Sequence, residues 1–256
     1  MDREIIKVPG VNNFRGLGGI KVGDKHFNNG FVYRSAGLHK IKKKGIKTLR
    51  ELKITTVLDL RNENEQAQNK DPEIPFLKTL GFDFTGGALP GITREQLGEM
   101  APSQFIKKAP RMEELYAFIL DEDHIGEVGR ALNALIATLL NGEAVLYHCS
   151  AGKDRTGILT MLLLKLLGAS EEEIFKDYLL TNDWAIPSAK RLMFLAKFKD
   201  KEMAKAIYPL YIADASYLHA AIDAITNNYG SFDNLFDNVF KIEKETVSRL
   251  KELCLS

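Results

Sequence analysis

The sequence has few cysteines and almost no tryptophan. Its 256 residues include two cysteines, Cys149 and Cys254, and one tryptophan. So low a cysteine count argues against a disulfide framework and against a metal site built from clustered thiolates. It is typical of a protein that is kept in a reducing, cytoplasm-like environment.

The sequence also lacks an excess of charge and a long apolar run. Its 35 Lys and Arg and 34 Asp and Glu leave a formal net charge of +1, which provides no global field for nucleic acid or for an acidic membrane. The longest apolar run, residues 158–167, is interrupted by Lys165 and is too short to span a bilayer. Residues 1–10 lack the apolar core of a signal peptide. We therefore expect a cytoplasmic protein with no nucleic-acid partner and no stable membrane insertion, although export without a conventional signal stays open.

Candidate strands alternate with candidate helices over the first two thirds of the chain. Apolar runs of strand length occur at residues 54–60, 77–84 and 144–148. Helical periodicity marks residues 110–140, with a break at DEDHIG, and residues from about 156 to 167. This alternation predicts an α/β fold with a central, mostly parallel sheet flanked by helices.

From residue 168 onward the pattern becomes almost wholly helical. Further helices are indicated at residues 188–207, 214–228 and 241–253. No internal repeat or low-complexity tract separates this part from the rest of the chain. We therefore expect a single domain over residues 1–256, in which residues 168–256 form a mostly helical flank or lid.

Residues 147–157 read YHCSAGKDRTG and connect the last candidate strand to the next candidate helix. Ligands of parallel sheets bind outside the carboxyl ends of the strands, and a helix N-terminus attracts anions. Consecutive backbone N–H groups in such a loop can surround one phosphate, and an arginine six residues after the cysteine can bind two of its oxygens. The residues expected to bind phosphate are Ser150, Ala151, Gly152, Lys153, Asp154, Arg155 and Thr156.

Cys149 begins this loop and is the expected nucleophile. Helix N-termini and neighbouring cations lower the pKa of a thiol to roughly 3.5–7.5, which makes the thiolate the resting form. The alternative is a small buried apolar residue, but this leaves the charged residues and the glycine of the same turn unexplained. A Walker A nucleotide loop is excluded, because Tyr147 and Asp154 occupy the positions of its first glycine and of its Ser or Thr.

The segment HCSAGKDRTG, residues 148–157, matches the signature H-C-x-x-x-x-x-R-[ST]-G of the cysteine-based protein tyrosine phosphatases at every fixed position. Together with NNFRGLGG at 12–19, YRSAGL at 33–38 and TVLDLRNENE at 56–65, it makes nearly the whole chain resemble the bacterial tyrosine and phosphoinositide phosphatases of that superfamily. The resemblance implies a phosphomonoester hydrolase that forms a phosphocysteine on Cys149, uses no metal or other cofactor and releases inorganic phosphate.

The resemblance also implies a class of substrates. Proteins or peptides that carry phosphotyrosine come first, while phosphoserine, phosphothreonine and phosphoinositides stay open. Lys153, in the middle of the loop, is expected to lie at the rim of the pocket. Related loops with lysine at this position often accept phosphoinositides. The alternative is a module that binds phospho-ligands with little or no turnover, because Gly16 stands where the family usually has an acidic residue. For Arg15 and Arg34 we expect structural ion pairs rather than direct support of the loop.

The general acid does not come from a W-P-D loop, because the single Trp184 is followed by Ala and Ile. Three aspartates are candidates. Asp59, near the end of a candidate strand, matches a proposed general acid of the resembling group, but it could instead pair with Arg61. Asp154 lies within the phosphate loop, where it could protonate the leaving group or orient water. Asp83 alternates with phenylalanines and is expected on the polar outer face of a strand.

Overall fold

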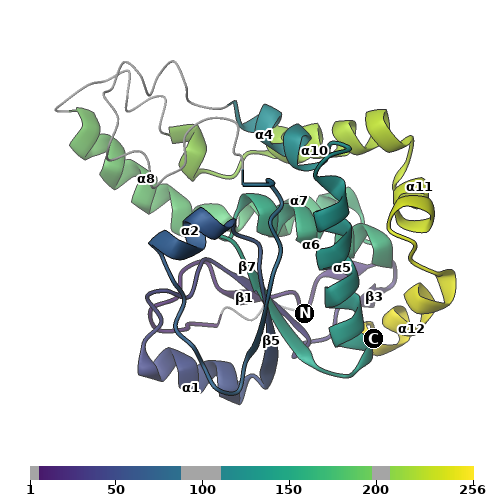
Figure 1. Ribbon diagram of the computed structural model, residues 1–256, viewed down its shortest axis with the longest axis horizontal. Helices are drawn as coiled ribbons and strands as arrows, with labels where there is room; N and C mark the ends of the chain where they lie inside the picture. Colours follow the sequence, from purple (N-terminus) through teal and green to yellow (C-terminus); the bar gives the residue numbers. More distant parts are fainter. Residues whose placement is uncertain (1–5, 88–110, 198–207) are drawn as a thin grey trace.

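The computed structural model describes residues 6–87, 111–197 and 208–256, and it contains one central sheet of five strands (Figure 1). The strand order is β1-β4-β7-β5-β6, with β1 antiparallel to β4 and the other neighbours parallel. The predicted mostly parallel sheet is therefore confirmed. The strands are β1 (Arg15–Gly16), β4 (Val32–Ser35), β5 (Ile54–Asp59), β6 (Lys78–Gly81) and β7 (Ala144–His148), and a separate hairpin contains β2 (Lys21–Val22) and β3 (Lys25–His26).

Helices flank the sheet and make up most of the C-terminal part. The predicted helical stretch at 110–140 is confirmed as two helices, α4 and α5, while α2 forms in a polar stretch where we predicted no element. Residues 198–207 of one predicted helix lie outside the described part of the chain. The helices are α1 (Lys43–Glu51), α2 (Glu63–Gln68), α4 (Met112–Ile119), α5 (Ile125–Leu140), α6 (Asp154–Leu167), α7 (Glu171–Leu179), α8 (Thr181–Lys197), α10 (Ala215–Tyr229), α11 (Phe232–Asn234), the π-helix η2 (Leu235–Val239) and α12 (Lys244–Cys254).

The central strands are apolar because both faces of the sheet are covered. Successive side chains of a strand point to opposite faces, so Val57 and Leu58 of β5 belong to two different cores. Leu146 and Tyr147 of β7 divide in the same way. In Figure 1, α1 lies on one side of the sheet, and α5 and α6 lie on the other. A parallel strand covered on both faces reads as a continuous apolar run, which is why these strands could be identified in the sequence.

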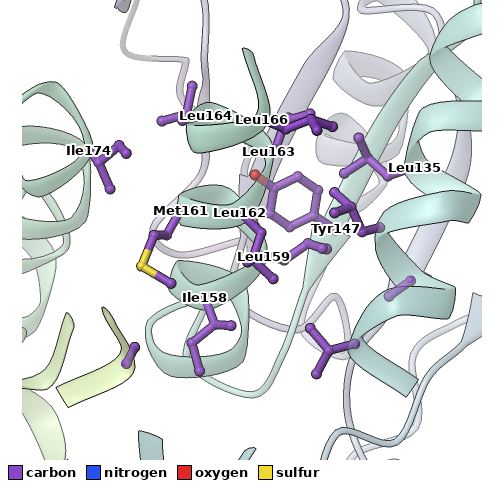
Figure 2. Close-up of a cluster of buried hydrophobic side chains, with 14 of the residues drawn as sticks. Leu135, Tyr147, Ile158, Leu159, Met161, Leu162, Leu163, Leu164, Leu166 and Ile174 are labelled. Carbon is purple, nitrogen blue, oxygen red and sulfur yellow. The ribbon is translucent and has the colours of Figure 1, made fainter. Parts of the chain in front are cut away.

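The larger core joins the sheet to the C-terminal helices. Residues 158–164 of α6 are all buried, as expected for a helix that other elements cover on every side. Figure 2 shows the ring of Tyr147 among the leucines of α6, with Leu135 of α5 beside it. Leu218 of α10 and Leu250 of α12 belong to the same core, so the C-terminal helices pack on the same apolar cluster as α5 and α6. Among the described residues, no helix is both long and apolar enough to cross a membrane.

Buried ion pairs hold α7 against the sheet. Nη1 of Arg34 lies 2.5 Å from Oδ2 of Asp177, and Nε of Arg15 lies 3.0 Å from Oδ1 of the same carboxylate. The side chains of Arg34 and Asp177 are fully buried. The expected structural ion pairs are thus confirmed, and they connect β1 and β4 to α7.

Replacing Arg34 should destabilise the fold strongly. In an Arg34→Met variant, the buried carboxylate of Asp177 loses its ion pair with Arg34, and the loss of one partner of a buried pair costs about 3–5 kcal/mol. Urea unfolding measures this change in the free energy of unfolding.

The matched control is Arg111→Met, because Arg111 pairs with Glu114 at 3.7 Å with both side chains mostly exposed, 77% and 64%. This variant should lose about 1 kcal/mol or less. Equal losses in the two variants would contradict the structural role of the buried pair.

Candidate active site

The loop between β7 and α6 is held from outside by two side chains. The amide nitrogen of Asn13 donates to the carbonyl oxygens of Ala151 and Gly152, at 3.1 and 2.9 Å. Nη2 of Arg34 also donates to the carbonyl of Gly152, at 2.9 Å. Across a trans peptide bond, the C=O of one residue and the N–H of the next point in opposite directions. The N–H groups of Gly152 and Lys153 therefore point away from these two side chains, toward the inside of the loop.

Arg34 thus both supports the loop directly and forms a structural ion pair, although only the ion pair was expected. Asn13 was not singled out from the sequence, and nothing in its neighbourhood there indicates a contact with residues 138 and 139 positions away. The NNFR stretch therefore contacts the phosphate loop through Asn13, whereas its Arg15 pairs with Asp177 of α7.

Gly152 is the residue at which the loop requires glycine. Its φ of +65° lies in the left-handed region, and a Cβ there would come within 2.3 Å of the carbonyl oxygen of Ser35. Any side chain would push the loop away from the end of β4. Gly152 therefore allows the close approach that puts its carbonyl within reach of Arg34.

The thiol of Cys149 lies at the C-terminal end of β7 and is 2% exposed. Burial by itself raises the pKa of Cys149, but the charge of Arg155 and hydrogen bonding by Thr156 outweigh it, so that the net pKa is lowered. The thiol is therefore as buried as the apolar alternative required, yet its surroundings favour the thiolate.

The guanidinium of Arg155 is fixed by a carboxylate that sequence reasoning did not assign. Nη2 of Arg155 lies 2.6 Å from Oε1 of Glu65, and Nη1 bonds the other oxygen of the same group. Nη1 also donates to the carbonyl of Leu60 at 3.1 Å, and the hydroxyl of Ser150 donates to Glu65 at 2.6 Å. Despite its burial, which would raise it, the pKa of Glu65 falls to about 2 because of Arg155 and these hydrogen bonds. The cation beside Cys149 is thus held in one place.

The sequence does contain a signal for the helix that carries Glu65. Asn62 and Glu65 have the spacing of a capping box, and the structure shows both of its hydrogen bonds at the start of α2. That signal predicts α2 but not its partner, because Arg155 is 90 residues away in the chain.

Asp59 is held in a buried bidentate pair. Its Oδ1 and Oδ2 accept from Nε and Nη2 of Arg61 at 2.8 and 2.7 Å, and its side chain is only 6% exposed. Nη2 of Arg61 also lies 2.8 Å from Asp71, whose carboxylate is 3.1 Å from Nε2 of His148. Burial lowers the pKa of His148, but the carboxylates of Asp71 and Asp59 raise it above its ordinary value. This geometry favours the structural alternative for Asp59.

Three of these residues also have the spacing of metal ligands. Ligand atoms of Asp59, Asp71 and His148 all lie within 4.8 Å of one another. Nη2 of Arg61 lies within 2.8 Å of both carboxylates, so a guanidinium already supplies the positive charge that a metal ion would bring. The group therefore does not fit a metal ion while Arg61 occupies it.

Asp154 begins α6 and is more accessible than Asp59. Its side chain is 19% exposed, and its Oδ1 accepts a hydrogen bond from the hydroxyl of Tyr116 at 2.9 Å. Asp83, in contrast, lies beyond the end of β6, where its carboxylate accepts from the backbone N–H groups of Thr85 and Gly87. The expectation that Asp83 is on the outer face of a strand is therefore wrong, because Asp83 forms a turn.

The expectation that Lys153 lies at the rim of the pocket is also wrong. Its side chain is fully buried, and its Nζ donates to the carbonyl oxygens of Leu210 and Ile212 at 3.0 and 2.9 Å. A buried ammonium needs such partners, and here they come from the segment before α10. These partners are 57 and 59 residues away in the chain, so local sequence pattern could not predict them.

A cysteine of lowered pKa at a strand end, amides turned inward and a fixed guanidinium together suit one reaction, the transfer of a phosphoryl group to sulfur. This combination defines the cysteine-dependent phosphatases. A family model described as the tyrosine phosphatase family matches residues 6–256, so the chain belongs to the tyrosine phosphatase family.

Three relatives bear related names. A protein of Cupriavidus necator named as a tyrosine-protein phosphatase is 27% identical over 235 residues, which cover 91% of this chain and 83% of its own. The triple specificity protein phosphatase PtpB of Mycobacterium tuberculosis is 27% identical over 288 aligned positions, covering 97% and 98% of the two chains. A tyrosine-protein phosphatase of Nostoc commune is 32% identical over 151 residues, which are 57% of this chain and 46% of that one.

The ion pair of Glu65 should make stability depend on acid pH. Because the pKa of Glu65 lies at about 2 rather than 4.5, its ionised form stabilises the fold above pH 4.5, and this contribution is lost as the pH falls toward 2. Between these limits the free energy of unfolding of the wild type should fall by about 3 kcal/mol more than that of a Glu65→Gln variant.

Urea unfolding at a series of pH values measures this difference. Glu63→Gln changes an exposed residue of the same helix and should keep the slope of the wild type. If Glu65→Gln keeps that slope as well, the buried pair does not stabilise the folded state.

Proposed function

We propose that this protein hydrolyses phosphomonoesters, with phosphotyrosine in proteins or peptides as the first substrate, through a phosphocysteine on Cys149. The observation that carries the proposal is the guanidinium of Arg155, which Glu65 fixes in place and whose charge lowers the pKa of Cys149. One loop supplies both the nucleophile and the groups that bind the phosphoryl oxygens.

In the first step the thiolate of Cys149 attacks phosphorus. The S–P bond forms while the P–O bond to the leaving group breaks, and the electron pair of that bond goes to the leaving oxygen. The inward N–H groups of the loop and the guanidinium of Arg155 stabilise the equatorial oxygens, which carry most of the charge in a loose transition state. To bind substrate, Arg155 must give up part of its contact with Glu65. The remaining contact keeps the guanidinium in position.

Asp154 is our choice for the general acid. It gives its proton to the leaving oxygen in the first step, and in the second step its carboxylate accepts a proton from the water that attacks phosphorus and releases inorganic phosphate. The exposure of its side chain, 19% against 6% for Asp59, supports this choice. Both oxygens of Asp59 are in addition bonded to Arg61.

Phosphoserine, phosphothreonine and phosphoinositides are further candidate substrates. The name of the mycobacterial relative, a triple specificity phosphatase, favours testing them. The buried position of Lys153, however, removes the local argument for phosphoinositides, because its ammonium bonds protein carbonyls. A panel of phosphopeptides and phosphoinositides, compared by kcat/KM, ranks these classes.

A Cys149→Ser variant should release no phosphate from p-nitrophenyl phosphate, while it still binds a phosphotyrosine peptide. A hydroxyl at this position is not ionised at neutral pH and cannot form the phosphocysteine. Release of p-nitrophenol and fluorescence polarisation measure turnover and binding, and vanadate should inhibit the wild type.

The matched control is Cys254→Ser, which replaces the other buried cysteine, at the end of α12, and should keep turnover. A wild type that binds the peptide without turnover would sink the proposal. It would favour a module that only binds phospho-ligands.

A further inference from the structure

We infer that Tyr116 of α4 is a positioning residue for the reaction, which selects the oxygen of Asp154 that transfers the proton. The inference rests on the proposed role of Asp154 as general acid. The hydroxyl of Tyr116 donates to Oδ1 of Asp154 at 2.9 Å. Nζ of Lys153 lies 3.2 Å from the same oxygen. Two donors on Oδ1 leave Oδ2 as the oxygen on which the transferable proton sits.

The direction of the hydrogen bonds follows from the number of protons. A carboxylate only accepts, so Tyr116 uses its single O–H on Asp154. The hydroxyl of Tyr178 is 2.6 Å from that of Tyr116, so it donates its own proton to the oxygen of Tyr116. Burial, and after it the charge of Asp154, raises the pKa of Tyr116 well above its ordinary value. Tyr116 therefore stays protonated and remains a donor throughout the cycle.

The rings that carry these hydroxyls are held rigidly. Tyr116 is 0% exposed, and its ring meets that of Tyr178 edge-on at 6.4 Å and that of Tyr217 at 5.8 Å. Tyr178 in turn packs on Gly157, where a Cβ would come within 2.9 Å of its ring. The glycine at the end of the phosphatase signature, Gly157, is therefore required by packing. It leaves space for the ring of Tyr178, whose hydroxyl reaches that of Tyr116.

This arrangement restrains the side chain of Asp154 at the start of α6. Without the bond from Tyr116, the carboxylate can rotate, and either oxygen can carry the proton. Correct placement of a general acid matters most when the leaving group is a poor one, since a good leaving group departs without a proton. The role of Tyr116 is therefore visible as a dependence of the rate on the leaving group.

The test compares kcat/KM for phenyl phosphate, a poor leaving group, with kcat/KM for p-nitrophenyl phosphate, a good one. Tyr116→Phe removes only the hydroxyl, and should lower the value for phenyl phosphate by about tenfold and that for p-nitrophenyl phosphate by less than about threefold. Asp154→Asn should show the same selectivity with a loss of about 100-fold or more. Inhibition by vanadate should be unchanged in Tyr116→Phe, because the phosphate loop is intact.

Two further variants ensure that the test does not depend on Tyr116→Phe alone. Tyr178→Phe keeps Tyr116 but removes its hydrogen-bond partner, and should give a smaller selective loss even if Tyr116→Phe does not fold. Tyr229→Phe is the matched control, because its hydroxyl donates to the carbonyl of Leu120 at 3.1 Å, outside the network of Asp154. It should not change the ratio of the two substrates. Thermal melting checks that each variant is folded.

The outcomes separate the inference from the proposal beneath it. Equal losses on both substrates, or no loss, in folded Tyr116→Phe and Tyr178→Phe would overturn the positioning role. If Asp154→Asn also lacks selectivity, the assignment of the general acid fails as well. Selectivity in Asp154→Asn alone keeps that assignment and refutes the role of Tyr116.

Discussion

The ion pair between Arg155 and Glu65 is the contact on which the site depends. A guanidinium beside Cys149 lowers the pKa of the thiol, but a buried cation without a partner is costly. Glu65 offsets that cost, and a capping box at the start of α2 together with the hydroxyl of Ser150 holds Glu65 in place. Because α2 follows β5 directly and β5 pairs with β7, the central sheet brings the carboxylate and the loop together.

A second buried pair supports the loop from the opposite side. Arg34 bonds Asp177 and the carbonyl of Gly152, so the charge that holds α7 on the sheet also orients a peptide of the phosphate loop. The two pairs hold different parts of the loop: Glu65 fixes the side chain of Arg155, whereas Arg34 fixes the backbone at Gly152. In the proposed mechanism both parts bind phosphoryl oxygens. Both pairs are nearly inaccessible to water, and therefore salt screens them little.

The sequence predicts those parts of the structure that depend on neighbouring residues. The strands covered on both faces, the helices α4 to α6 and the strand–loop–helix order around Cys149 follow from local pattern, and the resemblance adds the family. Contacts that join distant positions do not follow from it. Glu65 and Lys153 find their partners 90 and 57 residues away. For Asp59 the sequence left two roles open, and the structure shows the alternative pairing with Arg61, two residues away.

Helices beyond the sheet restrain Lys153 and Asp154, the second of which is our proposed general acid. Lys153 reaches the carbonyls before α10, and Tyr116 of α4 is backed by Tyr178 of α7. Lys153 and Asp154, at the start of α6, are therefore bonded to elements beyond the sheet. The carbonyl of Gly152 and the guanidinium of Arg155 are bonded instead to Arg34 of β4 and to Glu65 of α2. Under the proposed mechanism, a change to Tyr116 should therefore alter proton transfer and leave phosphate binding intact, because the side chain of Asp154 and the backbone of the loop rest on different contacts.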